Sequence, residues 1–126
     1  MDNIKKTIRI LKIEPQNLPY EKEIANDLEG IQGEVEGLFE CIYLDDNCIL
    51  VCNEEGKLNG MELNRRVGND IIAGPFFIVG DSEDGEFVSL SNEQIEKHTQ
   101  KFGKIQEFTG EESDARPRME FIGFDF

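Results

Sequence analysis

The residues best suited to chemistry lie together in the stretch 64–81, which reads NRRVGNDIIAGPFFIVGD. Its concentrated polar residues are Asn64, Arg65, Arg66, Asn69 and Asp70. Guanidinium groups bind carboxylates and phosphates through paired hydrogen bonds, so one interpretation is a site for an anionic or nucleotide-like ligand. The other interpretation is structural: an arginine bridges acidic loops, and Asn69-Asp70 forms a turn. We favour the structural interpretation, because arginines in acidic proteins usually neutralise charge.

The patterns that identify common catalytic sites are incomplete in this chain. Gly56-Lys57 resembles a phosphate-binding loop, but that motif needs Gly where Val51 stands and Ser or Thr where Leu58 stands. His98 is the only histidine, so every Ser-His or Cys-His pair would depend on a single helix residue, which more often packs than reacts. We therefore expect no enzymatic activity and no cofactor.

The three cysteines do not have the spacing of a metal site. Cys41, Cys48 and Cys52 are separated by six and three residues, whereas zinc sites use paired CxxC-type spacing. An odd number of cysteines in a reducing compartment favours free, buried thiols. A disulfide between Cys41 and Cys52 is the less favoured alternative, and we expect no metal.

The charge of the chain is strongly negative and unevenly distributed. Lys plus Arg is 13 and Asp plus Glu is 27, which gives −14. Residues 23–55 hold ten acids and no base, and residues 67–96 hold seven acids and no base. Such a surface repels nucleic acid and anionic lipid, so direct nucleic-acid binding is not expected. The acidity either maintains solubility or attracts a basic protein partner.

The length and the apolar pattern predict one domain. A chain of 126 residues is long enough for a single core, which we place in residues 1–103, with 104–126 as a C-terminal extension. No apolar run approaches the length of a membrane span, and the N-terminus MDNIKKTIRI lacks the apolar region of a signal peptide. We expect a cytoplasmic protein.

Short β-branched and apolar runs predict the strands that would position these residues. The expected strands are residues 7–13, 20–24, 38–44, 48–52, 76–79 and 87–88. The two around Asp45-Asp46-Asn47 should form a hairpin. A two-residue turn at Asp46-Asn47 places Cys41 opposite Cys52, and a three-residue turn shifts this register by one. Residues 58–66 read as an irregular connection.

Capping signals predict two short helices. Asn26 with Glu29 resembles a capping box for the first helix, and Ser91 with Gln94 is a clearer one for the second. Gly103 should end the second helix. We expect a single α+β domain with a mixed, largely antiparallel sheet of about five strands and two short helices on one face.

The extension combines two unlike segments. Residues 111–118 form a polar, flexible link, and residues 119–126, MEFIGFDF, resemble a strand. This end packs on the sheet edge of its own domain, remains disordered, or docks to a partner or a second copy.

Several ordered motifs resemble a known family. The residues that carry the likeness are Ile8 to Glu14, Leu44-Asp45-Asp46, Val51 to Leu58, Asn64-Arg65, Asp70 to Gly74, Phe77 to Gly80, and Phe87 to Leu90 through Gln94-Ile95. Over residues 6–102 this pattern resembles domain of unknown function family number 3846. The resemblance implies an accessory protein of phages, plasmids and conjugative elements of Gram-positive gut bacteria. It implies no catalytic residue.

Three classes of function follow from these observations. The first is a non-enzymatic interaction protein of a mobile element, whose acidic surface occupies the basic nucleic-acid channel of a host nuclease and so counters host defence. The second is a small anionic or nucleotide ligand-binding protein that uses Asn64, Arg65, Arg66 and Asp70. An enzyme is the third and the least favoured. The oligomeric state is left open by the sequence.

Overall fold

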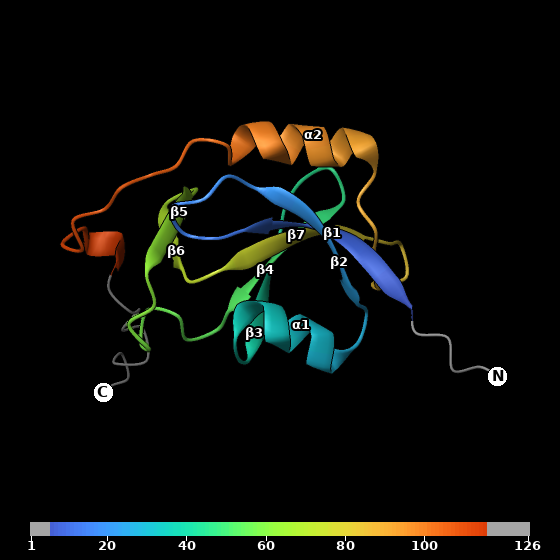
Figure 1. Cartoon of the computed structure of the whole chain (residues 1–126), viewed down its shortest axis with the longest axis horizontal. Helices are drawn as coiled ribbons and strands as arrows, with labels where there is room; N and C mark the ends of the chain where they lie inside the picture. Colours follow the sequence, from blue (N-terminus) through green and yellow to red (C-terminus); the bar gives the residue numbers. More distant parts are fainter. Residues whose placement is uncertain (1–5, 116–126) are drawn as a thin grey trace.

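The computed structural model describes residues 6–115 (Figure 1). The strands are β1 (Thr7–Ile13), β2 (Tyr20–Ala25), β3 (Phe39–Tyr43), β4 (Cys48–Asn53), β5 (Leu63–Val67), β6 (Asp70–Ala73), β7 (Phe76–Asp81) and β8 (Phe87–Val88). The helices are α1 (Leu28–Val35), α2 (Asn92–Lys101) and a short 3₁₀ turn, η1 (Ser113–Ala115). Within residues 6–115, no helix has both the length and the apolar character needed to cross a bilayer.

The main sheet has the strand order β2-β1-β7-β4-β3, and β8 pairs with the end of β7. Strands β5 and β6 form a separate two-stranded sheet. Every strand pairing in the described residues is antiparallel, so the parallel component of the expected mixed sheet does not occur there. The predicted α+β class and largely antiparallel sheet are confirmed, with a small second sheet added.

The two helices cover opposite faces of the main sheet, which corrects the expected placement on one face (Figure 1). Alternate residues of each central strand point to different layers. On β7, for example, Phe76 packs on the α2 side with Ile95 and Phe102, and Phe77 packs on the α1 side with Ile31 and Val35. Strands covered on both faces need continuous apolar runs, and β4 is buried along its whole length.

The hairpin of β3 and β4 uses the three-residue turn, not the two-residue one. The Leu44 amide donates to the Cys48 carbonyl over 2.9 Å, which closes a loop of three residues. Cys52 therefore pairs with Glu40, and Cys41 pairs with Val51. Cys41 packs on the α1 side and Cys52 on the α2 side, so the two thiols cannot meet, and all three cysteines are free.

The start of α1 also differs from the expectation. Asp27, one residue after the expected cap, accepts a hydrogen bond from the Gly30 amide over 2.7 Å. The Asn26 side chain instead donates to the Phe87 carbonyl, over 3.3 Å. The capping box of α2 is present as predicted, with the Ser91 hydroxyl accepting from the Gln94 amide and the Gln94 side chain accepting in return.

The described part of the C-terminal extension packs beside the small sheet. Gln106 accepts a hydrogen bond from the Arg66 amide, and Asp114 pairs with the Arg66 guanidinium over 2.9 Å. The turn η1 lies against β6. The added strand expected in residues 119–126 lies outside the described residues, as does the end of the expected flexible link.

A largely buried ion pair between Lys12 and Glu34 links β1 to α1. Lys12 is 6% exposed, and its ammonium lies 2.6 Å from the Glu34 carboxylate. The Lys22 ammonium lies 3.0 Å from the same carboxylate. Burial raises the pKa of Glu34, but the hydrogen bonds from the two lysines lower it more, so the net pKa lies below its usual value. The ionised carboxylate is therefore part of the folded state.

Replacing Glu34 with glutamine should make the free energy of unfolding depend less on pH in the acidic range. The contribution of an acid with a lowered folded-state pKa is complete above the unfolded-state pKa and is lost as the pH falls through the folded-state pKa. The unmodified chain should thus lose more free energy of unfolding between about pH 5 and about pH 3 than Glu34→Gln. Urea unfolding at each pH measures this loss. Glu83→Gln, in an exposed turn, should keep the original slope, and an unchanged slope in Glu34→Gln would contradict the prediction.

Candidate functional site

Strand β5 forms where an irregular connection was expected, and it buries the first two residues of the predicted polar cluster. Asn64 and Arg65 are both 0% exposed. The Asn64 amide donates to the carbonyls of Ile13 and Gly74, over 3.0 and 2.9 Å. These bonds join β5 to the end of β1 and to the bend before β7.

The Arg65 guanidinium holds three separate segments together. Its Nε donates to the Phe102 carbonyl over 3.0 Å, and Nη2 donates to the Asn17 carbonyl over 2.7 Å. Nη1 donates to the Asn64 side chain over 2.9 Å. Burial lowers the pKa of Arg65, and its acceptors among the described residues are uncharged oxygens. Its donors are therefore used inside the fold.

The other three residues of the predicted cluster lie apart from this pair. Arg66 points outward to Asp114, and Asn69 is exposed in the turn between β5 and β6. Asp70 accepts from the Lys57 ammonium over 2.5 Å and from the Ile71 amide over 2.8 Å. The structure thus keeps Asn64 and Arg65 together but does not gather the five into one site. Asp70 is the member of the five that lines the pocket described next.

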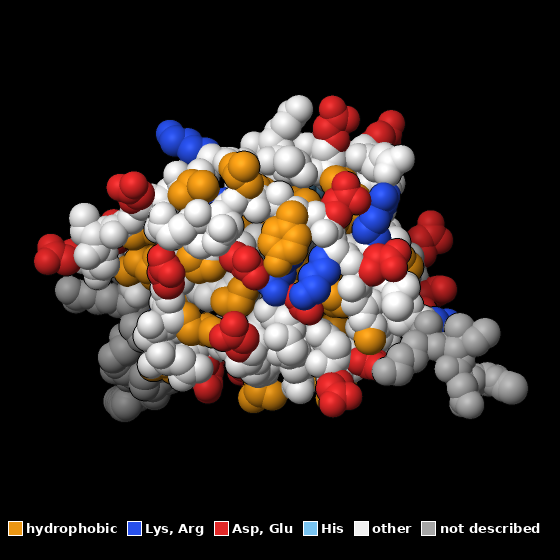
Figure 2. All heavy atoms as spheres, viewed as in Figure 1, with side chains coloured by type: hydrophobic (Ala, Val, Ile, Leu, Met, Phe, Trp, Pro, Cys, Tyr) orange, Lys and Arg blue, Asp and Glu red, His pale blue; other side chains and the backbone are white. Residues whose placement is uncertain are grey.

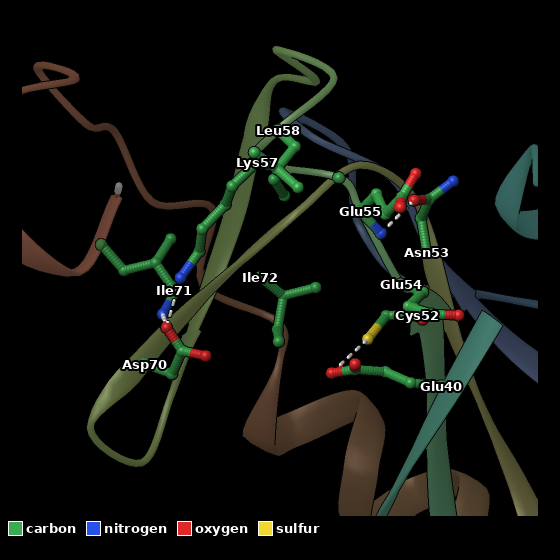
Figure 3. Close-up of a pocket in the computed structure, with 12 residues that line it drawn as sticks. Glu40, Cys52, Asn53, Glu54, Glu55, Lys57, Leu58, Asp70, Ile71 and Ile72 are labelled. Atoms are coloured by element: carbon green, nitrogen blue, oxygen red, sulfur yellow. Dashed lines mark hydrogen bonds and ion pairs between the residues drawn. The ribbon is translucent and has the colours of Figure 1, made fainter. Parts of the chain in front are cut away.

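That cavity is a pocket of about 240 Å³ between the end of β4, the loop after it, and β6 (Figure 3). It is smaller than the roughly 300–1,000 Å³ of typical small-molecule sites. Its lining residues are Glu40, Cys52, Asn53, Glu54, Glu55, Gly56, Lys57, Leu58, Asp70, Ile71, Ile72 and Ala73.

The pocket lining carries four carboxylates against one ammonium. Glu40 lies on β3, Glu54 and Glu55 follow β4, and Asp70 begins β6. The single cation, Lys57, extends along the pocket toward Asp70 and pairs with it (Figure 3). The net charge of −3 disfavours an anion and favours a cationic group.

Close packing fixes the loop that carries these acids. The Asn53 side chain donates to the Val35 carbonyl over 3.0 Å and accepts from the Glu55 amide over 2.7 Å. Gly56 passes so close to β6 that an added Cβ would lie 2.5 Å from the Ala73 carbonyl oxygen. Only glycine permits this approach, so the loop after β4 packs directly against β6 at this point.

The thiol in the pocket is not activated for nucleophilic chemistry. Burial, followed by the nearby Glu40 carboxylate, raises the pKa of Cys52 to about 12. The thiol lies 4.0 Å from that carboxylate, as a weak donor (Figure 3). Reactive cysteines need a lowered pKa and a positive environment, and Cys52 has neither.

Sequence reasoning missed most of these pocket residues. In the sequence, Gly56-Lys57 was considered only as part of an incomplete phosphate-binding motif. Glu54 and Glu55 are the last residues of segment 23–55, which has ten acids and no base. This run of acids was the sequence signal that could have indicated an acidic pocket. Glu40 and Asp70 could not be connected to them, because the register of β3 and the existence of β5 and β6 were not predicted.

The acidic character extends beyond the pocket. Acidic side chains are spread over the face shown in Figure 2, whereas lysines and arginines are sparse there. Exposed apolar side chains also occur on the surface, including Leu58 at the pocket, which is 68% exposed. The surface therefore presents dispersed negative charge with apolar gaps.

Comparison with known families identifies the chain. The profile of the family described as "Domain of unknown function (DUF3846)" matches residues 8–103. The chain belongs to this family. All the residues that line the pocket fall inside the DUF3846 match, and Gly103 is its last residue. The resemblance seen in the sequence is thereby confirmed, with bounds close to those expected. No curated protein and no solved structure matches this DUF3846 chain.

Proposed function

We propose that this DUF3846 protein is a non-enzymatic interaction protein that binds a basic protein surface, and that its pocket receives one Lys or Arg side chain of the partner. The observation that carries the proposal is the pocket itself. It is sized for a single side chain, and its lining has a net charge of −3. A cationic head group in the pocket would donate charge-assisted hydrogen bonds to these carboxylates.

The apolar part of the lining suits the same occupant. Ile71, Ile72 and the exposed Leu58 lie beside the carboxylates. Lys and Arg bury an aliphatic stem while presenting a charged head, so they match a pocket with both kinds of surface. A small anion would match neither part.

The class of partner follows from the charge outside the pocket. The chain of 126 residues has a formal net charge of −14, which attracts basic surfaces. In cells, strongly basic surfaces belong largely to proteins that bind nucleic acid. With the mobile-element setting that the family resemblance implies, we propose the nucleic-acid channel of a host nuclease as the partner surface. Occupying that channel would counter host defence.

The alternative of an anionic ligand at Asn64, Arg65, Arg66 and Asp70 has less support. The donors of Arg65 are directed at carbonyls, and Asp70 already binds Lys57. Arg66 alone presents its guanidinium at the surface, where it pairs with Asp114.

A pair of double variants with the same change in charge tests the pocket. Glu54→Gln with Glu55→Gln removes two charges from the lining, and Glu83→Gln with Asp84→Asn removes two from an exposed turn outside it. We expect the first pair to raise the Kd for an arginine-rich peptide at least fivefold, since each exposed ion pair contributes up to about 1 kcal/mol. The second pair should change it by less than about twofold. Fluorescence anisotropy at two salt concentrations measures both effects.

Equal weakening by the two double variants would show that only overall charge attracts the peptide, and would remove the pocket from the proposal. Affinity that does not fall with added salt would contradict the electrostatic basis itself.

A further inference from the structure

A second cluster of chemically capable side chains lies where the β3–β4 turn meets α2. It consists of Asp46, Cys48 and His98, whose potential ligand atoms all lie within 4.8 Å of one another. None of the three lines the acidic pocket. The cluster is formed by the fold, because His98 comes from a helix 50 residues along the chain from Cys48.

The geometry of the cluster is fixed from both sides. Cys48 is 1% exposed and His98 is 0% exposed. Asp46 has a left-handed backbone, with φ of 62°, and the Gln94 side chain of α2 donates to its carbonyl over 2.9 Å. The turn and the helix are thus joined directly beside the three side chains.

The hydrogen bonds of the cluster are unevenly distributed. Asp46 Oδ2 lies 3.2 Å from His98 Nε2 and 3.2 Å from the Lys97 ammonium. Asp46 Oδ1 and His98 Nδ1 are buried and have no hydrogen-bond partner in the described part of the chain. A buried carboxylate oxygen without a partner is costly, and its environment favours a cation.

We propose that Asp46, Cys48 and His98 bind one divalent transition-metal ion, with Zn²⁺ as the preferred ion. A carboxylate oxygen, a thiolate and an imidazole nitrogen together form a donor set that suits a borderline-soft cation and not Mg²⁺ or Ca²⁺. Ligands at about 2.0–2.3 Å from a tetrahedral centre stand somewhat over 3 Å apart, close to the separation of Asp46 Oδ2 and His98 Nε2. Three protein ligands leave a fourth position for water.

Binding requires one proton to leave. Burial and the Asp46 carboxylate raise the pKa of Cys48 to about 12, so the thiol is protonated before the ion arrives. As the sulfur–metal bond forms, the S–H bond breaks and the proton passes to solvent. No electron is transferred.

Lys97 gives the proposal a distinguishing feature. Its ammonium already pairs with Asp46 Oδ2, so it competes with an incoming cation. Removing this charge without touching a ligand should strengthen metal binding, whereas a cluster that has only a structural role predicts no such gain.

The test is a titration of the purified full chain, stripped of metal, with Co²⁺ alone. We expect one ion per chain and a thiolate-to-cobalt charge-transfer band, which one equivalent of Zn²⁺ then removes. Cys48→Ser should abolish the band, and His98→Gln should weaken affinity at least tenfold. Cys52→Ser, a change at another buried thiol, should leave both unchanged, and Lys97→Gln should raise affinity several-fold.

Absence of the band in the unmodified chain, or its persistence in Cys48→Ser, would overturn the proposal. So would loss of the band in Cys52→Ser with Cys48 intact. Because Lys97→Gln retains all three ligands, it keeps the test decisive if a ligand variant fails to fold. Unchanged or weaker affinity in Lys97→Gln would count against the site.

Discussion

Arg65→Ala should lower the free energy of unfolding by about 3–5 kcal/mol, the range for losing a large buried group together with its hydrogen bonds. The side chain is fully buried and donates to the carbonyls of Asn17 and Phe102, which would be left without their donor. The Phe102 carbonyl also lies at the negative end of α2, where a cation is stabilising. Chemical unfolding in urea measures the loss.

The neighbouring arginine is the natural control. Arg66 has the same chemistry, but its guanidinium is exposed and its ion pair with Asp114 is at the surface. Arg66→Ala should therefore lose no more than about 1 kcal/mol. Arg65→Lys should fall between the two, because it keeps the charge without the forked donor. Equal losses at the two positions would show that Arg65 does not hold the three segments together.

Phe77→Ala should lower the free energy of unfolding by about 3–5 kcal/mol through the cavity it leaves. Phe77 is 0% exposed and packs in the layer under α1. Tyr43→Ala removes an aromatic side chain that is 71% exposed, and should change stability by less than about 0.5 kcal/mol. Urea unfolding of both variants gives the comparison, and similar losses would contradict the burial of Phe77.

A double-mutant cycle extends this prediction to the separation of the two layers. The rings of Phe76 and Phe102 meet edge-on, with centroids 5.5 Å apart. Changing both to leucine should show a coupling of about 0.5–1.5 kcal/mol. Phe77 lies on the other face, so Phe77→Leu should be additive with Phe102→Leu. Coupling of equal size in the two cycles would mean that the layers are not independent.

Local signals in the sequence were enough for most of the secondary structure. The run TIRILKI became β1 within its predicted bounds, and Ser91 with Gln94 capped α2 as expected. These features depend on neighbouring residues only. The first helix shows the limit of such signals, since Asn26 and Asp27 are both good caps and the choice depends on a contact between Asn26 and distant Phe87.

Features that depend on distant partners were not predictable. The stretch LNRRV reads as a loop because Asn and Arg are polar, yet it forms β5 and buries two of them. Those side chains are satisfied by carbonyls elsewhere, such as Asn17, 48 residues away. The hairpin register was open for a similar reason, because two turn lengths satisfied the same residues. The placement of the helices on opposite faces likewise follows from packing.

For the candidate sites too, local composition was readable from the sequence, whereas the contacts between distant residues were not. The acidity that the pocket depends on was visible in the composition, but its geometry needed β3 and β6 to lie beside the loop after β4. The cluster of Asp46, Cys48 and His98 matched no spacing template, since templates describe ligands near one another in sequence. Its members meet only after α2 docks on the turn.

Strand β7 supplies alternate side chains to both apolar layers and pairs with β1, β4 and β8. Neither layer can therefore open without disturbing a strand that the other needs. We therefore expect the two layers to unfold together as one cooperative unit. Because both layers share β7, neither is expected to remain folded once this strand is lost.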